Sequence, residues 1–149
     1  MTALTELLHF DRQTQALGQV SGRLGWDQET MMPSGSSAQR GEEMAALEGV
    51  LHARRSDPRV GDWLAACDGQ AFDRVTQAQL REIKTAYERA VKVPGDLAEA
   101  IASTTSMAQG KWAAARAEDD FAAFAPVLQE VLALKREEGQ ALAAGGDVY

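Results

Sequence analysis

The sequence has few of the side chains that metal sites and nucleophilic active sites need. Only two of its 149 residues are histidines, His9 and His52, and neither belongs to a His-Glu-x-x-His segment or another close ligand pair. A conventional zinc site built from this chain alone is therefore not predicted. The chain also lacks a phosphate-binding glycine loop, a dinucleotide fingerprint and the Gly-x-Ser-x-Gly turn of serine hydrolases. Nucleotide-binding and serine-hydrolase functions are left without support.

Cysteine and long apolar runs are scarce as well. Cys67 is the only cysteine, so no disulfide can form within the chain and nothing favours an oxidising compartment. It follows a predicted short helix whose dipole disfavours a thiolate, so we interpret it as a small core residue. The first six residues do not form a signal-peptide pattern, and no apolar run approaches the roughly 20 residues of a membrane span. We predict a cytoplasmic protein without a membrane partner.

Positive charge is in deficit. The chain has 22 acidic and 15 basic residues, a formal net charge of −7, and a protein of this charge repels phosphate backbones. The densest basic group is Arg54 and Arg55 with Arg59 nearby, which we interpret as complementing the dipole at a helix C-terminus. No nucleic-acid partner is predicted.

What the sequence does contain favours helices. Hydrophobic residues make up 45% of the chain, charged residues 25%, and there are only 4 prolines. No stretch alternates with a period of two for long enough to form a strand, and no internal repeat is present. The length suits one domain. The prediction is a single all-α domain over residues 1–149, built from about six helices.

The first predicted helix is long and covers residues 2–32, with Thr2 or Thr5 as its N-cap and Pro33 ending it. About 30 helical residues rise roughly 45 Å, whereas a compact chain of this size has a radius of gyration of about 15 Å. We therefore expect an elongated bundle, or a helix that leans on something outside this chain. An apolar stripe with a seven-residue repeat, widened by two further positions, is predicted to be core. Its members are Ala3, Leu7, Phe10, Leu17, Val20, Leu24 and Met31.

Caps and helix breakers divide the rest of the chain. Further helices are predicted from 36 or 37 to about 54, 58 to about 67, 72 or 76 to 91, 94 or 95 to about 118, and about 121 to the glycines at 145 and 146. The expected N-caps are Ser36 or Ser37, Asp57 before Pro58, and the pair Asp119 and Asp120. The apolar stripes predicted on these helices include Val50, Leu51, Trp112, Phe121 and Leu132.

The segment WDQETMMP at residues 26–33 holds the most unusual group of side chains. Asp27 and Glu29 lie two residues apart, which places them about 200° apart around a helix, so they cannot act as a pair. We expect one of them to turn inward and accept a hydrogen bond from Trp26 or from Arg40. The alternative is a contact surface for another domain, because tryptophan, methionine and carboxylate together suit a semi-buried interface.

The longer string LGWDQETMMPSG, residues 24–35, resembles the opening signature of the carboxypeptidase Taq family of metal-dependent carboxypeptidases. Other segments resemble the family in the family's own order, so the resemblance covers nearly the whole chain. They are Arg40, Asp57-Pro58-x-x-Gly61-Asp62-x-Leu64, Leu80-Arg81-Glu82-Ile83, Tyr87-Glu88-Arg89-Ala90 before Val93-Pro94, Trp112-x-x-Ala115-Arg116, and Asp120-Phe121-x-x-Phe124-x-Pro126-x-Leu128.

This resemblance implies a mostly helical cytoplasmic peptidase that uses zinc or cobalt, resembles neurolysin and the angiotensin-converting enzymes in fold, and releases amino acids from peptide C-termini. In that family the His-Glu-x-x-His helix, the third metal ligand and the groups that hold the substrate carboxylate lie downstream of the region matched here. No catalytic and no metal-binding residue is therefore carried over to this chain. The implied role is the N-terminal lid or wall of a substrate groove, inactive by itself.

This interpretation predicts three partners: the remaining catalytic part of the enzyme, a second copy in a homodimer, and peptide substrate only in the full-length enzyme. Zinc or cobalt is likewise implied for the full-length enzyme alone. The alternative hypothesis is a stand-alone helical module that binds another protein and has no enzymatic activity. The candidate interdomain or structural contacts are Trp26, Asp27, Gln28, Glu29, Met31, Met32, Arg40, Trp112 and Arg116.

Overall fold

The computed structural model describes residues 2–143 and 145–147, and this part of the chain contains helices and no strand. The all-α prediction is confirmed. The elements are α1 (Ala3–Thr30), the short 3-10 helix η1 (Ser34–Ser36), α2 (Ser37–Arg55), α3 (Pro58–Cys67), α4 (Arg74–Ala90), α5 (Gly95–Ala117) and α6 (Phe121–Ala143).

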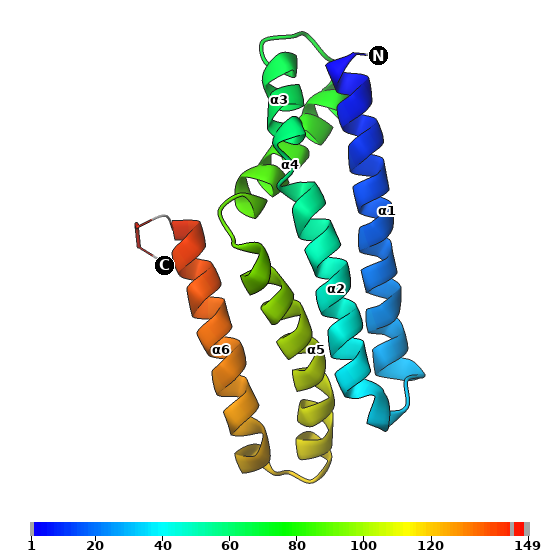
Figure 1. Cartoon of the computed structure of the whole chain (residues 1–149), viewed down its shortest axis with the longest axis vertical. Helices are drawn as coiled ribbons and strands as arrows, with labels where there is room; N and C mark the ends of the chain where they lie inside the picture. The colour runs from blue at the N-terminus through cyan, green and yellow to red at the C-terminus, as the bar shows by residue number, and fades with distance from the viewer. Residues whose placement is uncertain (1, 144, 148–149) are drawn as a thin grey trace.

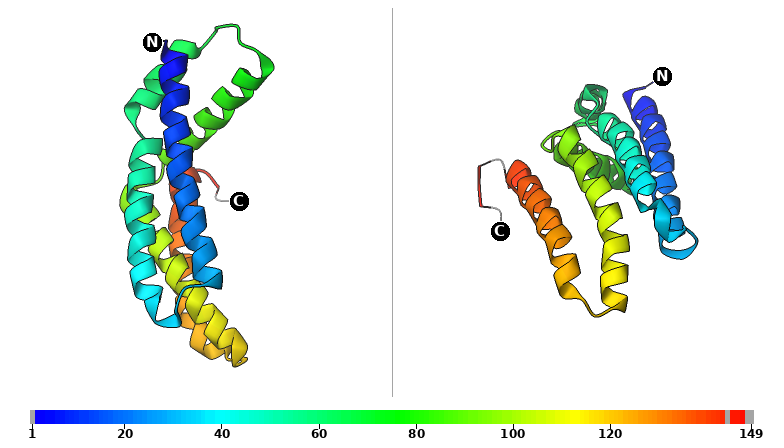
Figure 2. Two further views of the ribbon diagram at one scale, coloured as in Figure 1. Left: turned by 90° about the vertical axis from the view of Figure 1, so that its right-hand side faces the viewer. Right: turned by 60° about the horizontal axis from the view of Figure 1, so that its bottom comes forward.

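The four long helices lie side by side in an elongated layer, in the order α1, α2, α5, α6 (Figure 1). The most extensive packing is between α2 and α5, and α6 packs mainly on α5. The shorter helices α3 and α4 gather at the end of the layer where α1 begins, with α3 packed against α1 (Figures 1 and 2). An open layer of this kind leaves more helix surface facing outward than a closed bundle would.

Most of the predicted helix starts are confirmed by their capping bonds. Thr2 Oγ1 accepts the backbone N–H of Thr5 at 3.2 Å, and the Asp57 carboxylate accepts that of Arg59 at 2.9 Å. At the last start, Asp120 accepts the N–H of Ala123 at 3.0 Å. These side chains satisfy N–H groups that have no partner within the helix.

One predicted helix start is confirmed in position only, and one predicted helix end is wrong. Ser36 occupies the N-cap position of α2, but its side chain makes no capping hydrogen bond, and the Ser37 hydroxyl donates backward to the Ser34 carbonyl at 3.3 Å. The first helix ends at Thr30 rather than at residue 32, because Met31 already leaves the helical conformation with a φ of −121°.

The largest core cluster lies where α1, α3 and α4 meet. Leu7 has no exposed surface there, and Phe10 packs edge-on against Trp63 with ring centroids 5.6 Å apart. Val60 from α3 and Ile83 from α4 complete the cluster. The predicted core positions Leu7 and Phe10 are therefore confirmed, and Leu51 of α2 is buried as well.

Several predicted core positions are exposed instead. A straight helix drifts about 20° per heptad from a seven-residue repeat, so the stripe that buries Phe10 turns away from the layer three heptads later. Met31 is 71% exposed for this reason and because it lies beyond the helix end. The remaining errors arise because one side of each long helix in the layer has no neighbour. The exposed positions are Val20, Val50, Trp112, Phe121 and Leu132.

Substitution by valine should destabilise the chain at one glycine and have little effect at another. A Cβ at Gly61 would lie 2.7 Å from Tyr87 Oη and 3.0 Å from its Cζ, whereas a Cβ at Gly22 would meet nothing within 4 Å. We expect Gly61→Val to lower the free energy of unfolding by about 1–3 kcal/mol through overpacking. Gly22→Val should leave it within about 0.5 kcal/mol, since both residues are modest helix formers. Urea unfolding of the two variants checks this, and equal stabilities would contradict it.

Candidate functional site

The residues singled out in the sequence form a polar junction where α1 turns into α2, here called the α1–α2 joint (residues 24–36 with Arg40). Arg40 is only 8% exposed, and its guanidinium donates to Asp27 Oδ2 at 2.5 Å, to Glu43 Oε2 at 2.9 Å and to the carbonyl of Leu24. The prediction that a carboxylate here accepts from Arg40 is confirmed for Asp27. Glu29 is exposed.

The charge state of this junction is fixed by its geometry. The hydrogen bond to Asp27 raises the pKa of Arg40, and Glu43 adds to this effect while burial opposes it. An arginine is in any case charged at all accessible pH values. Arg40 is therefore a permanently charged donor that joins α2 to the end of α1.

Gln28 extends the joint to α5. Its side-chain amide donates to the carbonyl of Ser106 at 2.6 Å, while its oxygen accepts from the hydroxyl of Ser106 at 2.8 Å. This reciprocal pair joins α1 to α5, and Arg40 joins the same end of α1 to α2. Ser106 is not among the residues predicted from the sequence, because it follows Thr104 and Thr105 in α5 and its burial is visible only in the structure.

The apolar side chains of the joint point outward from this fastened backbone. Trp26 is 64% exposed and Met31 is 71% exposed, while Met32 is half-buried. A shallow hollow of about 170 Å³ lies beside them, lined by Met31, Met32, Asp27 and Arg40 among others. The joint thus combines a rigid polar base with large exposed side chains.

The other candidate pair, Trp112 and Arg116, lies at the tip formed by α5 and α6. Half of the Trp112 surface is exposed, and Arg116 lies 3.7 Å from Asp119 in a solvent-facing ion pair. Together with Phe121 and Phe124 they line a hollow of about 290 Å³. In the described part of the chain, no hydrogen bond or ion pair joins this group to the α1–α2 joint.

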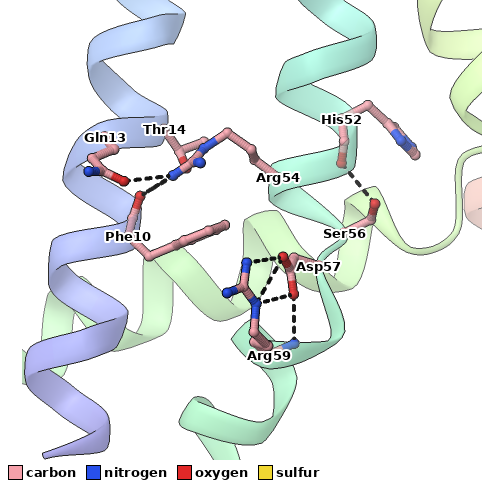
Figure 3. Close-up of polar contacts among 8 residues, drawn as sticks. All are labelled: Phe10, Gln13, Thr14, His52, Arg54, Ser56, Asp57 and Arg59. Atoms are coloured by element: carbon pink, nitrogen blue, oxygen red, sulfur yellow. Dashed lines mark hydrogen bonds and ion pairs between the residues drawn. The ribbon is translucent and has the colours of Figure 1, made fainter. Parts of the chain in front are cut away.

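The arginine group at the end of α2 serves to attach helices (Figure 3). Arg54 lies 4.0 Å above the ring of Phe10, donates to the Phe10 carbonyl at 3.1 Å, and donates to Thr14 Oγ1 at 3.0 Å. The Arg54 guanidinium therefore joins the end of α2 to α1. This supports a structural role for Arg54, although its partners are in α1 rather than at the end of its own helix. Arg55 pairs instead with Glu48 of α2 at 3.0 Å.

Asp57 and Arg59 form an ion pair that is also drawn in Figure 3, with 2.7 Å between Asp57 Oδ2 and the Arg59 guanidinium. Hydrogen bonding to Arg59 lowers the pKa of Asp57 below its ordinary 3.8, although burial opposes the change. The unfolded chain therefore binds this proton at a higher pH than the folded chain does. The stabilisation is fully present above about pH 4 and is lost as the pH falls through the folded pKa.

A pH series on Asp57→Asn tests this contribution. Asparagine keeps the helix cap but not the charge, so the variant should be slightly less stable than the parent at pH 7. This difference in unfolding free energy should shrink toward zero as the pH falls below the folded pKa. Comparing the two proteins by urea unfolding cancels the other acidic groups. A difference that stays constant with pH would contradict the assignment.

The other potentially reactive side chains, His52 and Cys67, also take part in packing or in contacts between elements. His52 Nε2 lies 2.7 Å from the Val93 carbonyl, which joins the end of α2 to the turn before α5. Cys67 is buried, and burial raises the pKa of its thiol. In residues 2–143 and 145–147, no three His, Cys, Asp or Glu side chains come together in a way that fits a metal ion. None of the described helices is long and apolar enough to cross a membrane.

The fold and these contacts define a structural class, an elongated all-helical layer in which polar side chains join neighbouring helices. Comparison of the sequence with known families identifies the family. The sequence model of the carboxypeptidase Taq (M32) metallopeptidases matches residues 6–149, and the chain belongs to this family. The resemblance noted in the signature LGWDQETMMPSG is thereby confirmed.

The relatives are considerably longer than this chain. Thermostable carboxypeptidase 1 of Thermus thermophilus is 39% identical over 146 residues, which are 95% of this chain and 29% of the relative. Its namesake from Pyrococcus furiosus is 24% identical over 147 residues, 98% of this chain and 30% of the relative. The chain therefore spans less than a third of the length of either relative.

Solved structures agree in fold. Metallocarboxypeptidase 1 of Trypanosoma cruzi is 30% identical with a TM-score of 0.70, over 96% of this chain and 29% of that one. A crystal structure named BsuCP has a TM-score of 0.89 at 18% identity, over 95% of this chain and 29% of that one. At this identity the second likeness concerns the fold alone.

Proposed function

We propose that this chain is the N-terminal helical part of a metallocarboxypeptidase that releases C-terminal amino acids from peptides, and that it forms a wall or lid of the substrate groove. The observation that carries the proposal is that this member of the family aligns with only 29% of the Thermus relative. The metal, zinc or cobalt, and the catalytic groups belong to the remaining part. The chain by itself is expected to be inactive, and its location cytoplasmic.

The exposed aromatic and sulfur side chains are the proposed contacts with that remaining part. Trp26 and Met31 project from a backbone that Arg40 and Gln28 hold in place. Because this backbone is already held in place, covering these side chains costs little additional backbone entropy. Trp112 and Arg116 offer a second contact at the tip of α5 and α6. Glu29 and Met32 lie at the margin of the first contact.

A chimera tests the function directly. This chain would replace the matched segment of the Thermus thermophilus carboxypeptidase, and release of C-terminal amino acids would be assayed with added zinc or cobalt. We expect activity from the chimera and none from the isolated chain under the same conditions. Release by the isolated chain would contradict the proposal. A folded, metal-loaded but inactive chimera would favour the stand-alone binding module instead.

The contact role of Trp26 gives a prediction that depends on context. Trp26→Ala should change the stability of the isolated chain by no more than about 0.5 kcal/mol, because most of the ring is in water. In the chimera it should cost about 1–3 kcal/mol if the ring is covered. Trp63→Ala is the matched control. Because Trp63 packs on Phe10, this substitution should destabilise both the isolated chain and the chimera. Equal effects of Trp26→Ala in the two proteins would refute the contact.

We also propose that the chain forms a homodimer through its exposed apolar surface. In the part of the chain that the structure describes, nine large hydrophobic side chains are at least 41% exposed, and exposed apolar patches promote association. Light scattering across a concentration series checks the assembly state. A strictly monomeric species at high concentration would count against a dimer.

A further inference from the structure

Helix α6 carries an apolar stripe that the described part of the chain covers only in part. The stripe consists of Phe121, Ala125, Leu128 and Leu132, whose spacing of four, three and four residues places them on one side of the helix. Phe121 is 68% and Leu132 is 44% exposed, while Ala125 and Leu128 are half-buried. We call these four residues the outer stripe of α6. It begins at the hollow beside Trp112, which is already a proposed contact.

The outer stripe does not face the neighbours that α6 has. Val127 is buried, and Glu138, eleven positions later on the same face, lies 2.8 Å from Arg89 of α4. At about 100° per residue, the stripe lies roughly 100–160° around the helix from Val127. Helix α6 is also the outermost helix of the layer and packs mainly on α5 (Figure 1). A cover for the stripe therefore has to come from outside the described helices.

Basic side chains flank the stripe in the second half of α6. Lys135 and Arg136 lie on its two sides, and the three glutamates of α6 lie on other faces. Lys135 is 3.0 Å from Glu138, and Arg136 is exposed. Acidic residues precede the stripe at the other end of α6, where Asp120 caps the helix. The half of the stripe toward the C-terminal end of α6 thus favours an apolar partner with acidic flanks.

The polypeptide that continues beyond this segment in the relatives starts beside α6. The matched segment makes up only 29% of the Thermus and Trypanosoma proteins, so the larger part of each follows it. Helix α6 ends at Ala143, where Gly145 adopts a φ of 89° and the Gly146 N–H donates to the Ala143 carbonyl at 2.9 Å. From Ala143 to residue 149 the chain spans at most about 20 Å even when fully extended. A segment tethered this closely has an effective concentration on the order of millimolar, which favours it over a second copy.

We propose that the segment directly following this one in the longer family polypeptide forms a helix that packs on the outer stripe of α6, with apolar side chains against Leu128 and Leu132 and acidic side chains beside Arg136. The pairs α1–α2 and α5–α6 have the same arrangement, because each consists of consecutive helices that follow a short connection and pack together. This inference rests on the proposed function, since the occupant belongs to the remaining part of the enzyme. The layer is thereby extended by one helix.

Thiol labelling measures whether the stripe is covered. In a Cys67→Ala background, Leu132→Cys places a thiol on the stripe, and Glu130→Cys places one about 200° around the same helix as the matched control. Labelling with N-ethylmaleimide is followed by mass spectrometry in the isolated chain and in the Thermus chimera. The protection factor is the rate in the isolated chain divided by the rate in the chimera. It should be about ten or more for Leu132→Cys and close to one for Glu130→Cys.

Photo-cross-linking identifies the occupant. Leu132→p-benzoylphenylalanine in the chimera should cross-link to a peptide within about 40 residues after the matched segment, the length of a connection and one helix as long as α6. Peptide mapping by mass spectrometry locates the cross-link. A cross-link to a later part of the relative, or one between two copies of the chain, overturns the assignment. Glu130→p-benzoylphenylalanine is the control and should not give the same product.

The acidic flank of the occupant gives Arg136→Glu a specific effect. This variant should lower the protection factor of the Leu132→Cys thiol about twofold to fivefold, because like charges then face each other at the margin of the contact. Arg23→Glu makes the same charge change at an exposed position of α1 and should leave the protection factor unchanged. Equal protection factors in the two variants would contradict an acidic flank.

The outcomes separate this inference from the proposed function. An active chimera whose Leu132→Cys thiol reacts as fast as in the isolated chain overturns the assignment of the stripe alone. An inactive chimera with a protected thiol and the expected cross-link overturns the function and keeps the assignment. Equal protection of the Leu132→Cys and Glu130→Cys thiols would mean that α6 is covered all round, which overturns the assignment to the stripe. A chimera that fails to fold is replaced by the isolated chain mixed with the separately purified remainder of the relative.

Discussion

Replacing Arg40 with alanine is expected to lower the free energy of unfolding of the chain by about 2–3 kcal/mol. Arg40 is 8% exposed and makes three polar contacts, including one to a backbone carbonyl. Its removal leaves these acceptors without a donor. The Asp27 and Glu43 side chains are each 40% exposed and can regain water, so the loss should fall below that of a fully buried pair. Urea unfolding followed by far-ultraviolet circular dichroism measures it.

Two further variants decide whether geometry or charge is responsible. Arg40→Lys keeps the charge, but one ammonium group cannot reach acceptors in three directions, so it should recover less than half of the loss. Arg81→Ala removes an ion pair that is 3.8 Å long and largely exposed, and it should change stability by no more than about 0.5 kcal/mol. If Arg40→Ala costs no more than Arg81→Ala, the joint does not fasten α1 to α2.

Leu7→Ala is expected to cost about 3–4 kcal/mol, because it removes a side chain without exposed surface from the centre of the main cluster. Phe10, Val60 and Ile83 come from three different helices and cannot all move inward to fill the space. The cost therefore includes a cavity in addition to the lost burial of the side chain. Chemical or thermal unfolding of the isolated chain measures it.

The matched control is Leu132→Ala on α6. Leu132 is 44% exposed, so the same chemical change should cost less than about 1.5 kcal/mol. Leu132→Ala is also informative in the chimera. A larger loss of unfolding free energy there than in the isolated chain would show that the longer protein covers α6. A Leu7→Ala cost as small as that of Leu132→Ala in the isolated chain would mean that the α1, α3 and α4 cluster does not fold cooperatively with the layer.

The parts of the site that could be predicted are those with local signals. Asp27 and Arg40 lie on either side of one turn, so a hydrogen bond across it was a short-range expectation. Gln28 and Ser106 are 78 residues apart, and nothing in the sequence near either residue selects the other. Arg54 and Phe10 pose the same problem at a separation of 44 residues. The likeness to neurolysin and the angiotensin-converting enzymes stays a prediction.

The sequence by itself determined the helices and the family. Caps such as Asp57 and Asp120 act on N–H groups within three residues, and the apolar repeat acts within one or two turns, so both are readable locally. The family signature is likewise a property of the string. None of these signals depends on where another helix lies.

Only the tertiary structure decided which apolar faces are covered. Periodicity shows that a helix has an apolar side, but burial depends on a neighbour from elsewhere in the chain. Phe10 has such neighbours in α3 and α4 and is buried, whereas Met31, Val50 and Phe121 face outward from the layer. The hollow lined by Asp11 of α1 and Val75 of α4 depends in the same way on how these two helices lie relative to each other, which no local pattern encodes.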